Sequence, residues 1–149
     1  FHSTLSNLKR KRLLSYNIKT QTFSLTPKGR KESFFAQTRI KGAIFEKNEN
    51  RKEKWDGYWR IVIFDIPNKL KRMREALRDL LKGLGFQKLQ NSVWIYPYKI
   101  PEFLDETLND SQIKKYVRFL LVKEIYYDWD IKKIFFKNNY STIRRTPYN

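Results

Sequence analysis

The 149-residue sequence contains no cysteine and only one histidine, His2. Without cysteine, disulfides, thiolate metal sites and cysteine nucleophiles are excluded. A single histidine near the start of the chain also removes most serine–histidine catalysis and histidine-rich zinc chemistry. The absence of cysteine fits a reducing compartment, and with no signal-peptide pattern present we expect a cytoplasmic protein.

Long hydrophobic runs are also missing, since no stretch approaches the roughly 20 apolar residues that span a membrane. Acidic residues are scarce: 15 Asp and Glu stand against 32 Lys and Arg, which gives a net charge of +17 and a pI of about 10.1. Such an excess of positive charge favours a polyanionic partner. We expect nucleic acid, and specifically double-stranded DNA, rather than a membrane, because the aromatic residues are spread along the chain.

The residues that are present predict two parts joined by a linker. Apolar residues make up 40 % of the chain, which is enough for a packed core. The polar stretch EKNENRKEKWDG is typical of a linker. The expected division is an N-terminal part at 1–45, the linker at 46–57, a larger domain at 58–127 and a C-terminal extension or tail at 128–149.

The N-terminal part predicts a helix, a β-hairpin and a second helix. The first helix is expected over 4–15, TLSNLKRKRLLS, where leucines lie roughly on one face. Short extended runs then flank a polar tip at 19–22. Thr26 followed by Pro27 is a cap with a proline at the first helical position, so the second helix is expected to start at Pro27. Residues 1–54 hold 14 Lys and Arg but only 4 Asp and Glu.

A basic helix followed by a basic-tipped hairpin resembles the recognition helix and wing of bacterial winged-helix regulators. In that fold the helix enters the major groove and the wing contacts phosphates. The residues expected to bind DNA are Thr4, Asn7, Arg10, Lys11, Arg12, Lys19, Thr20, Gln21, Lys28, Arg30 and Lys31. The alternative is a small basic helix and hairpin without a special role. Because the chain starts at Phe1 almost inside a helical pattern, we expect the preceding helices of the fold in a segment before it.

The larger part alternates strands and helices. The expected elements are a strand at 59–66, a helix at 69–84 that ends at a Gly85 cap, a hairpin at 86–98, a helix from Pro101 and a strand at 116–127. The order βαββαβ is that of the ferredoxin-like split unit. The expected fold class is therefore α+β, a partial winged helix followed by a ferredoxin-like domain.

The first and last of these strands are apolar on both faces, whereas two helices cover only one face of such a sheet. A second copy of the sheet is the simplest cover for the other face. We therefore expect a homodimer in which two sheets pack face to face.

The stretch RIVIFDIPNKLKRMREALRDLLKGLGFQKLQNSVWIYPY resembles the small ferredoxin-like CRISPR-associated endonuclease of the spacer-acquisition complex. The shared features are an acid at the end of the first strand, Asp65, then a basic helix and a hairpin with Gln90, Ser92 and Val93. The flank KWDGYWRIVIFDIP more closely resembles the central domain of PaaX-like repressors of the phenylacetate pathway. The resemblance implies a winged helix ahead of this domain. The last 22 residues depart from the repressor pattern, which includes a long C-terminal domain.

Asp65 has two interpretations. The resemblance to the nuclease family implies that this carboxylate binds Mg²⁺ or Mn²⁺ together with its symmetry mate, and that the metal activates water. In the structural interpretation Asp65 accepts hydrogen bonds from the loop at 66–69 or pairs with Arg72 or Arg74. Because no second acid or histidine completes a catalytic set, we favour the structural role.

These observations favour a DNA-binding transcriptional regulator, a repressor, that requires no cofactor. The alternative is a Mg²⁺- or Mn²⁺-dependent endonuclease or spacer-acquisition subunit, with other CRISPR adaptation proteins as partners. A third reading is an RNA-binding module. The basic face of the helix at 69–84 is either part of a shared nucleic-acid surface or only a solvated face; its residues are Lys69, Lys71, Arg72, Arg78 and Lys82.

Overall fold

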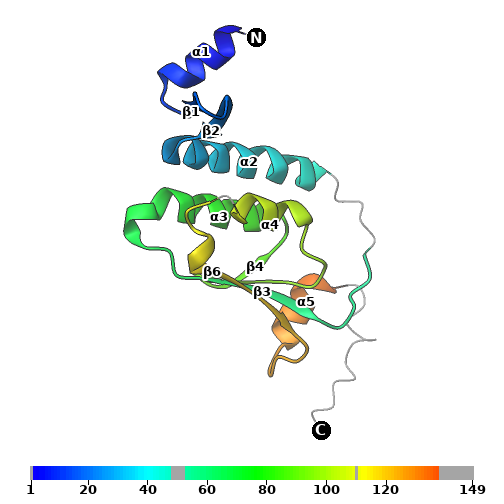
Figure 1. The fold of residues 1–149 in the computed structure, drawn as a ribbon. Helices are drawn as coiled ribbons and strands as arrows, with labels where there is room; N and C mark the ends of the chain where they lie inside the picture. The colour runs from blue at the N-terminus through cyan, green and yellow to red at the C-terminus, as the bar shows by residue number, and fades with distance from the viewer. Residues whose placement is uncertain (1, 48–52, 110, 138–149) are drawn as a thin grey trace.

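The computed structural model describes residues 2–47, 53–109 and 111–137. The N-terminal elements are α1 (His2–Arg10), the strands β1 (Leu14–Asn17) and β2 (Thr22–Leu25), and the long helix α2 (Pro27–Lys47). Figure 1 shows α1 and the hairpin at one end of α2, projecting away from the rest of the molecule. The middle of the expected linker, 48–52, lies outside the described residues.

The first helix is shorter than the sequence predicts. It ends at Arg10 rather than Ser15, because Arg12 takes a left-handed backbone conformation (φ 57°) and Leu14 already belongs to β1. Tertiary pairing sets this end: the Leu13 carbonyl accepts a hydrogen bond from the Thr26 N–H (3.0 Å). A leucine that fits the helical stripe is thus used to close the base of the hairpin.

The start of α2 at Pro27 is confirmed. The Thr26 hydroxyl accepts a hydrogen bond from the Gly29 N–H (3.0 Å), as an N-cap does, and donates one to the Arg12 carbonyl (2.7 Å). Gly29 is required by this close approach, because a Cβ there would lie 2.0 Å from the Leu13 carbonyl oxygen. The cap therefore fixes the helix and the base of the hairpin together.

The larger part has the βαββαβ order that the sequence predicts. Its elements are β3 (Trp59–Phe64), η1 (Asn68–Leu70), α3 (Lys71–Gly83), β4 (Gln87–Gln90), β5 (Val93–Tyr96), α4 (Glu102–Asn109), η2 (Lys114–Tyr116) and β6 (Val117–Val122). The sheet order is β4-β5-β3-β6 with antiparallel neighbours throughout. With α3 and α4 on one face, this is a ferredoxin-like α+β unit.

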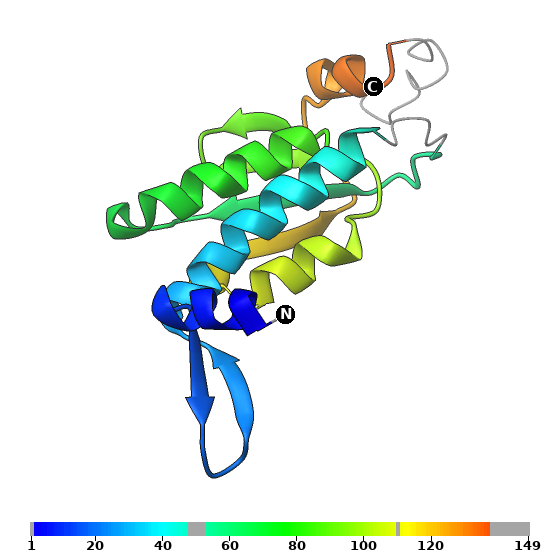
Figure 2. The ribbon, with the colours of Figure 1, turned by 90° about the horizontal axis from the view of Figure 1, so that it is seen from above.

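The main core lies between the sheet and its two helices. Alternate residues of β3, Val62 and Phe64, are buried against Met73, Leu77 and other apolar side chains of α3. The long helix α2 lies across α3 and α4 as a further layer (Figures 1 and 2), and its Phe34 is only 2 % exposed within this core. The helix that carries the hairpin is thus fixed to the ferredoxin-like unit.

The other face of the sheet is partly covered by the chain itself. Helix α5 (Trp129–Phe135), within the expected tail, buries Trp59, Ile95 and its own Ile131 in a second cluster. The expected second copy therefore has only the remainder of this face to cover, because α5 already covers one end of it. Beyond α5, Ile63 and Leu120 remain 38 % exposed on the same face.

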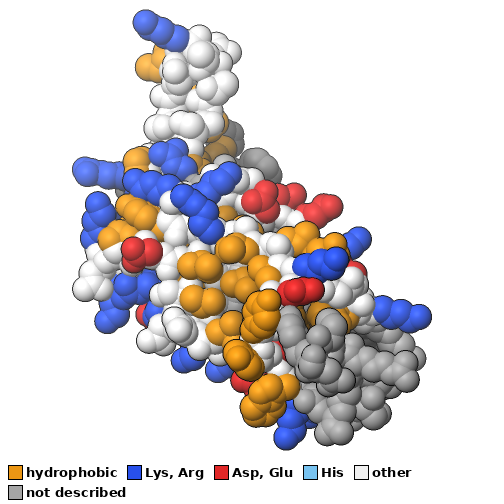
Figure 3. Space-filling view, turned by 90° about the horizontal axis from the view of Figure 1, so that it is seen from below, with side chains coloured by type: hydrophobic (Ala, Val, Ile, Leu, Met, Phe, Trp, Pro, Cys, Tyr) orange, Lys and Arg blue, Asp and Glu red, His pale blue; other side chains and the backbone are white. Residues whose placement is uncertain are grey.

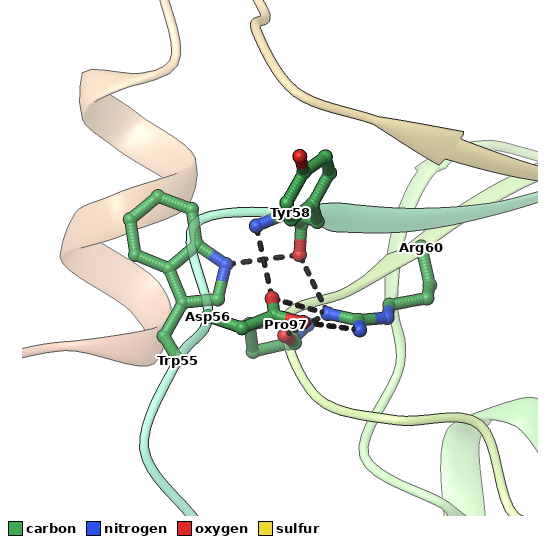
Figure 4. Close-up of polar contacts among 5 residues, drawn as sticks. All are labelled: Trp55, Asp56, Tyr58, Arg60 and Pro97. Atoms are coloured by element: carbon green, nitrogen blue, oxygen red, sulfur yellow. Dashed lines mark hydrogen bonds and ion pairs between the residues drawn. The ribbon is translucent and has the colours of Figure 1, made fainter.

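The end of the linker is part of the folded domain. The buried Arg60 guanidinium donates two hydrogen bonds to the Asp56 carboxylate (2.7 and 2.6 Å) and others to the carbonyls of Tyr58 (2.8 Å) and Pro97 (2.9 Å) (Figure 4). The Trp55 indole N–H also donates to the Tyr58 carbonyl (3.0 Å). The hydrogen-bonded Arg60 lowers the pKa of Asp56 to about 2. This network anchors the chain where it enters β3.

Across the described residues, no helix has both the length and the apolar character that crossing a membrane requires.

Candidate nucleic-acid interface

The polar and basic residues expected on the first helix lie on the surface of α1 and just after it. Thr4, Asn7, Arg10, Lys11 and Arg12 are all exposed. The Arg10 guanidinium donates a hydrogen bond to the Asn7 side-chain carbonyl (2.9 Å), one turn earlier. A guanidinium oriented in this way is a suitable donor for a phosphate or a base edge.

The hairpin tip is ordered by one side chain. The Asn17 carboxamide oxygen accepts hydrogen bonds from the backbone N–H groups of Lys19 (3.0 Å) and Thr20 (3.3 Å). Gln21 completes the turn in a left-handed conformation (φ 54°). As a result Lys19, Thr20 and Gln21 are exposed at the far end of the hairpin, which projects clear of the other elements (Figure 2).

The basic residues at the start of α2 have a partly structural role. Lys28 donates to the Lys11 carbonyl (3.2 Å) and Arg30 donates to the Leu25 carbonyl (3.0 Å), so both hold the base of the hairpin. Lys31 is half-buried. Lys28 and Arg30 are nonetheless exposed, as the expected DNA-binding residues of α1 and the tip are.

The hairpin also carries an aromatic pair that was not predicted from the sequence. Tyr16 and Phe23 are cross-strand partners with ring centroids 4.8 Å apart, and both remain more than 40 % exposed. The Lys9 ammonium lies over both rings, 5.4 Å from the Tyr16 centroid and 4.9 Å from that of Phe23. This contact joins α1 to the hairpin. The sequence does indicate this pair, because one aromatic residue stands on each side of the hairpin tip.

In the η1–α3 segment, some basic side chains contact other residues and others are exposed to solvent. The Arg72 guanidinium lies 4.8 Å from the Phe35 ring centroid of α2, and Arg78 pairs with Glu75 (2.6 Å). Lys69, Lys71 and Lys82 are exposed. Part of this face is thus structural, and the remaining lysines are available to a polyanion.

Asp65 does not have the structural partners that we expected. Among the described residues, none donates a hydrogen bond to its exposed carboxylate or forms an ion pair with it. Arg74 instead donates to the Ile66 carbonyl (2.9 Å) and the Asn68 side chain (3.2 Å), and Arg72 is held by Phe35. The structural interpretation of Asp65 is therefore wrong in its stated contacts.

The metal interpretation of Asp65 finds no ligand set within one chain. The described ranges contain no group of three or more His, Asp or Glu side chains that fits a metal ion. A single carboxylate does not provide the several oxygen ligands that Mg²⁺ or Mn²⁺ takes. The residues of one chain thus do not fit this cofactor.

Comparison with known families identifies the sheet domain. Residues 52–131 match the family model described as the PaaX protein central Cas2-like domain. The matched range includes every element of the four-stranded sheet and both helices that cover it. No curated protein and no solved structure matches the chain.

Proposed function

The chain belongs to the PaaX family, whose central Cas2-like domain spans its residues 52–131, and from this premise we propose that it is a DNA-binding transcriptional regulator that acts as a repressor. The observation that carries the proposal is the projecting unit of α1 and the β1–β2 hairpin. Its exposed surface is basic, and α2 attaches it firmly to the sheet domain (Figure 2).

In the proposed mode of binding, this unit is the recognition helix and wing of a winged helix. α1 lies in the major groove and presents Asn7, Arg10 and Lys11 to base edges and phosphates. The tip, with Lys19, contacts the backbone beside it. The Lys9 contact with Tyr16 and Phe23 supports this reading, because it holds the helix and the wing in one orientation.

We also propose that two chains pair through the part of the sheet that α5 leaves open. Figure 3 shows a broad apolar surface on this side of the molecule. Ile63 and Leu120 lie there on neighbouring strands, and both are exposed. A two-fold dimer then presents two DNA-binding units, so the operator is expected to be roughly palindromic.

The proposal is tested by incubating the purified protein with labelled duplex DNA, single-stranded DNA and RNA, with and without Mn²⁺. A regulator shifts the duplex without cutting it, and its affinity falls steeply with salt because Lys and Arg displace condensed counterions. Metal-dependent cleavage would identify the nuclease alternative instead. Preferential binding of RNA or single strands would favour the RNA-binding module.

A further inference from the structure

A cavity of about 950 Å³ opens where η1, the end of α4, η2 and β6 meet. Among the described residues, four cationic side chains line it, namely Lys69, Lys114, Lys115 and Arg118, and one carboxylate does, Asp105. Uncharged hydrogen-bonding side chains complete the polar part of the wall, among them Ser111 and Gln112. The lining therefore has the composition of an anion-binding site.

Two of the four cations of this cavity have an uncharged partner: Lys114 donates a hydrogen bond to the Asn109 side-chain carbonyl, and the Lys115 ammonium lies 5.1 Å from the Tyr116 ring centroid. None of the four forms an ion pair with a residue in the described part of the chain. Arg118 donates to the backbone carbonyls of Lys115 (3.1 Å) and Val117 (2.9 Å), so its guanidinium is held in place. The carboxylate of Asp105 accepts a hydrogen bond from the Asn109 side-chain amide (3.2 Å). All four cationic side chains are exposed, and no described carboxylate pairs with them.

The cavity lies at the same end of the molecule as the hairpin. Figures 1 and 2 show that α2 begins, α3 begins and β6 begins at this end, and the hairpin projects from the start of α2. The contact of Arg72 with Phe35 joins the start of α3 to α2. Figure 3 shows Lys and Arg side chains gathered along this end.

We propose that this cavity binds the sugar-phosphate backbone of DNA next to the segment that α1 and the hairpin contact. The inference rests on the proposed function and extends it: the ferredoxin-like domain itself holds the flanking duplex. An open, cationic cleft with hydroxyl and amide groups suits phosphate oxygens and carries no sequence information. The protein's footprint is then longer than a winged helix alone would make it.

The test uses two double variants with the same change of charge. Lys69→Gln with Lys115→Gln removes two cations from the cavity. Lys123→Gln with Lys133→Gln removes two exposed cations beyond the end of β6 and on α5, away from it. Binding to duplexes of about 10 and about 30 base pairs is measured over a range of salt concentrations, and circular dichroism checks that each variant is folded.

On the longer duplex, the cavity variant is expected to lower the slope of log affinity against log salt by about 2, since each lost phosphate contact contributes about 0.9. On the short duplex, it should match the wild type, and the control variant should match the wild type on both. Equal slopes for the wild type and the cavity variant on the longer duplex would overturn the inference while leaving the proposed function intact. A wild type that binds no duplex would overturn both.

Inorganic pyrophosphate, measured by calorimetry at constant ionic strength, separates a backbone site from a small-ligand site. Saturable binding to the wild type that the cavity variant loses, together with unchanged DNA slopes, would assign the cavity to a small phosphorylated molecule and overturn the backbone inference.

Discussion

Arg60 is buried near the start of strand β3, and its charge is balanced by Asp56, which is partly exposed. Removing the carboxylate leaves a buried guanidinium with only carbonyl acceptors. We expect Asp56→Asn to lower the free energy of unfolding by about 2 kcal/mol at pH 7. Urea denaturation checks this, and Glu124→Gln, which neutralises an exposed acid after β6, is the control.

The same pair predicts how stability depends on pH. The pKa of Asp56 falls from its ordinary value of 3.8 to about 2 on folding. The stabilisation is therefore complete above about pH 4 and is lost as the pH falls through about 2. Because the carboxylate is partly solvated, we expect a loss of about 1 kcal/mol. The difference in unfolding free energy between the wild type and Asp56→Asn should shrink over this range; a constant difference would contradict the assignment.

Asp65 has an exposed carboxylate that no described group hydrogen-bonds or pairs with, so its removal should change stability little. We expect Asp65→Asn to change the unfolding free energy by no more than about 0.5 kcal/mol, as is usual for an exposed site. DNA binding should stay near the wild-type level. Cleavage of nucleic acid by the wild type with Mn²⁺, abolished in Asp65→Asn, would show that this carboxylate is a catalytic metal ligand.

Helix α1 and the turn after it are expected to provide much of the affinity for DNA. Replacing Arg10, Lys11 and Arg12 by Ala should reduce affinity for duplex DNA roughly tenfold or more and lower the salt slope by about 3. Fluorescence anisotropy over a salt series measures both.

The matched control for α1 replaces three exposed lysines far from the hairpin by Ala, namely Lys99, Lys123 and Lys133. Lys132 is unsuitable for this purpose because it is buried and paired with Asp128 (3.1 Å). If both triple variants bind alike, α1 is not the recognition helix.

Some helix ends could be predicted from short sequence patterns. Tertiary contacts determined the end of α1 and the presence of α5. The start of α2 was predictable because Thr26 and Pro27 suffice to begin a helix. The end of α1 was not, since the Leu13 carbonyl accepts a hydrogen bond from the N–H of Thr26, the residue after β2. Helix α5 was missed because it is short, and its stability comes from packing Ile131 against Trp59 rather than from propensity.

The candidate site was predictable in its residue types but not in its contacts. An excess of Lys and Arg in the first third of the sequence pointed to the α1–hairpin unit. The fold determines which of these cations contact other parts of the protein. Arg30 donates a hydrogen bond to the Leu25 carbonyl, and Arg72 lies over the Phe35 ring. The pairing of Arg60 with Asp56 likewise depends on how the chain enters β3.

The whole molecule exposes an apolar sheet face, and the proposed dimer is tested there. Ile63→Arg places a charge on the open face and should convert a dimer to a monomer at micromolar concentration, measured by light scattering. Leu121→Arg is the matched control, because Leu121 lies on edge strand β6 and its side chain belongs to the opposite face. A wild type that is monomeric at this concentration would contradict the proposal.

The packing of α2 through Phe34 into the sheet domain has a consequence for how the proposed dimer reads its operator. A recognition unit that cannot swivel on its dimer fixes both the distance and the rotational phase between two half-sites. Because B-DNA turns once in about 10.5 base pairs, inserting about 5 base pairs between the half-sites places them on opposite sides of the duplex. Binding should then fall sharply and recover when the insertion reaches a full turn.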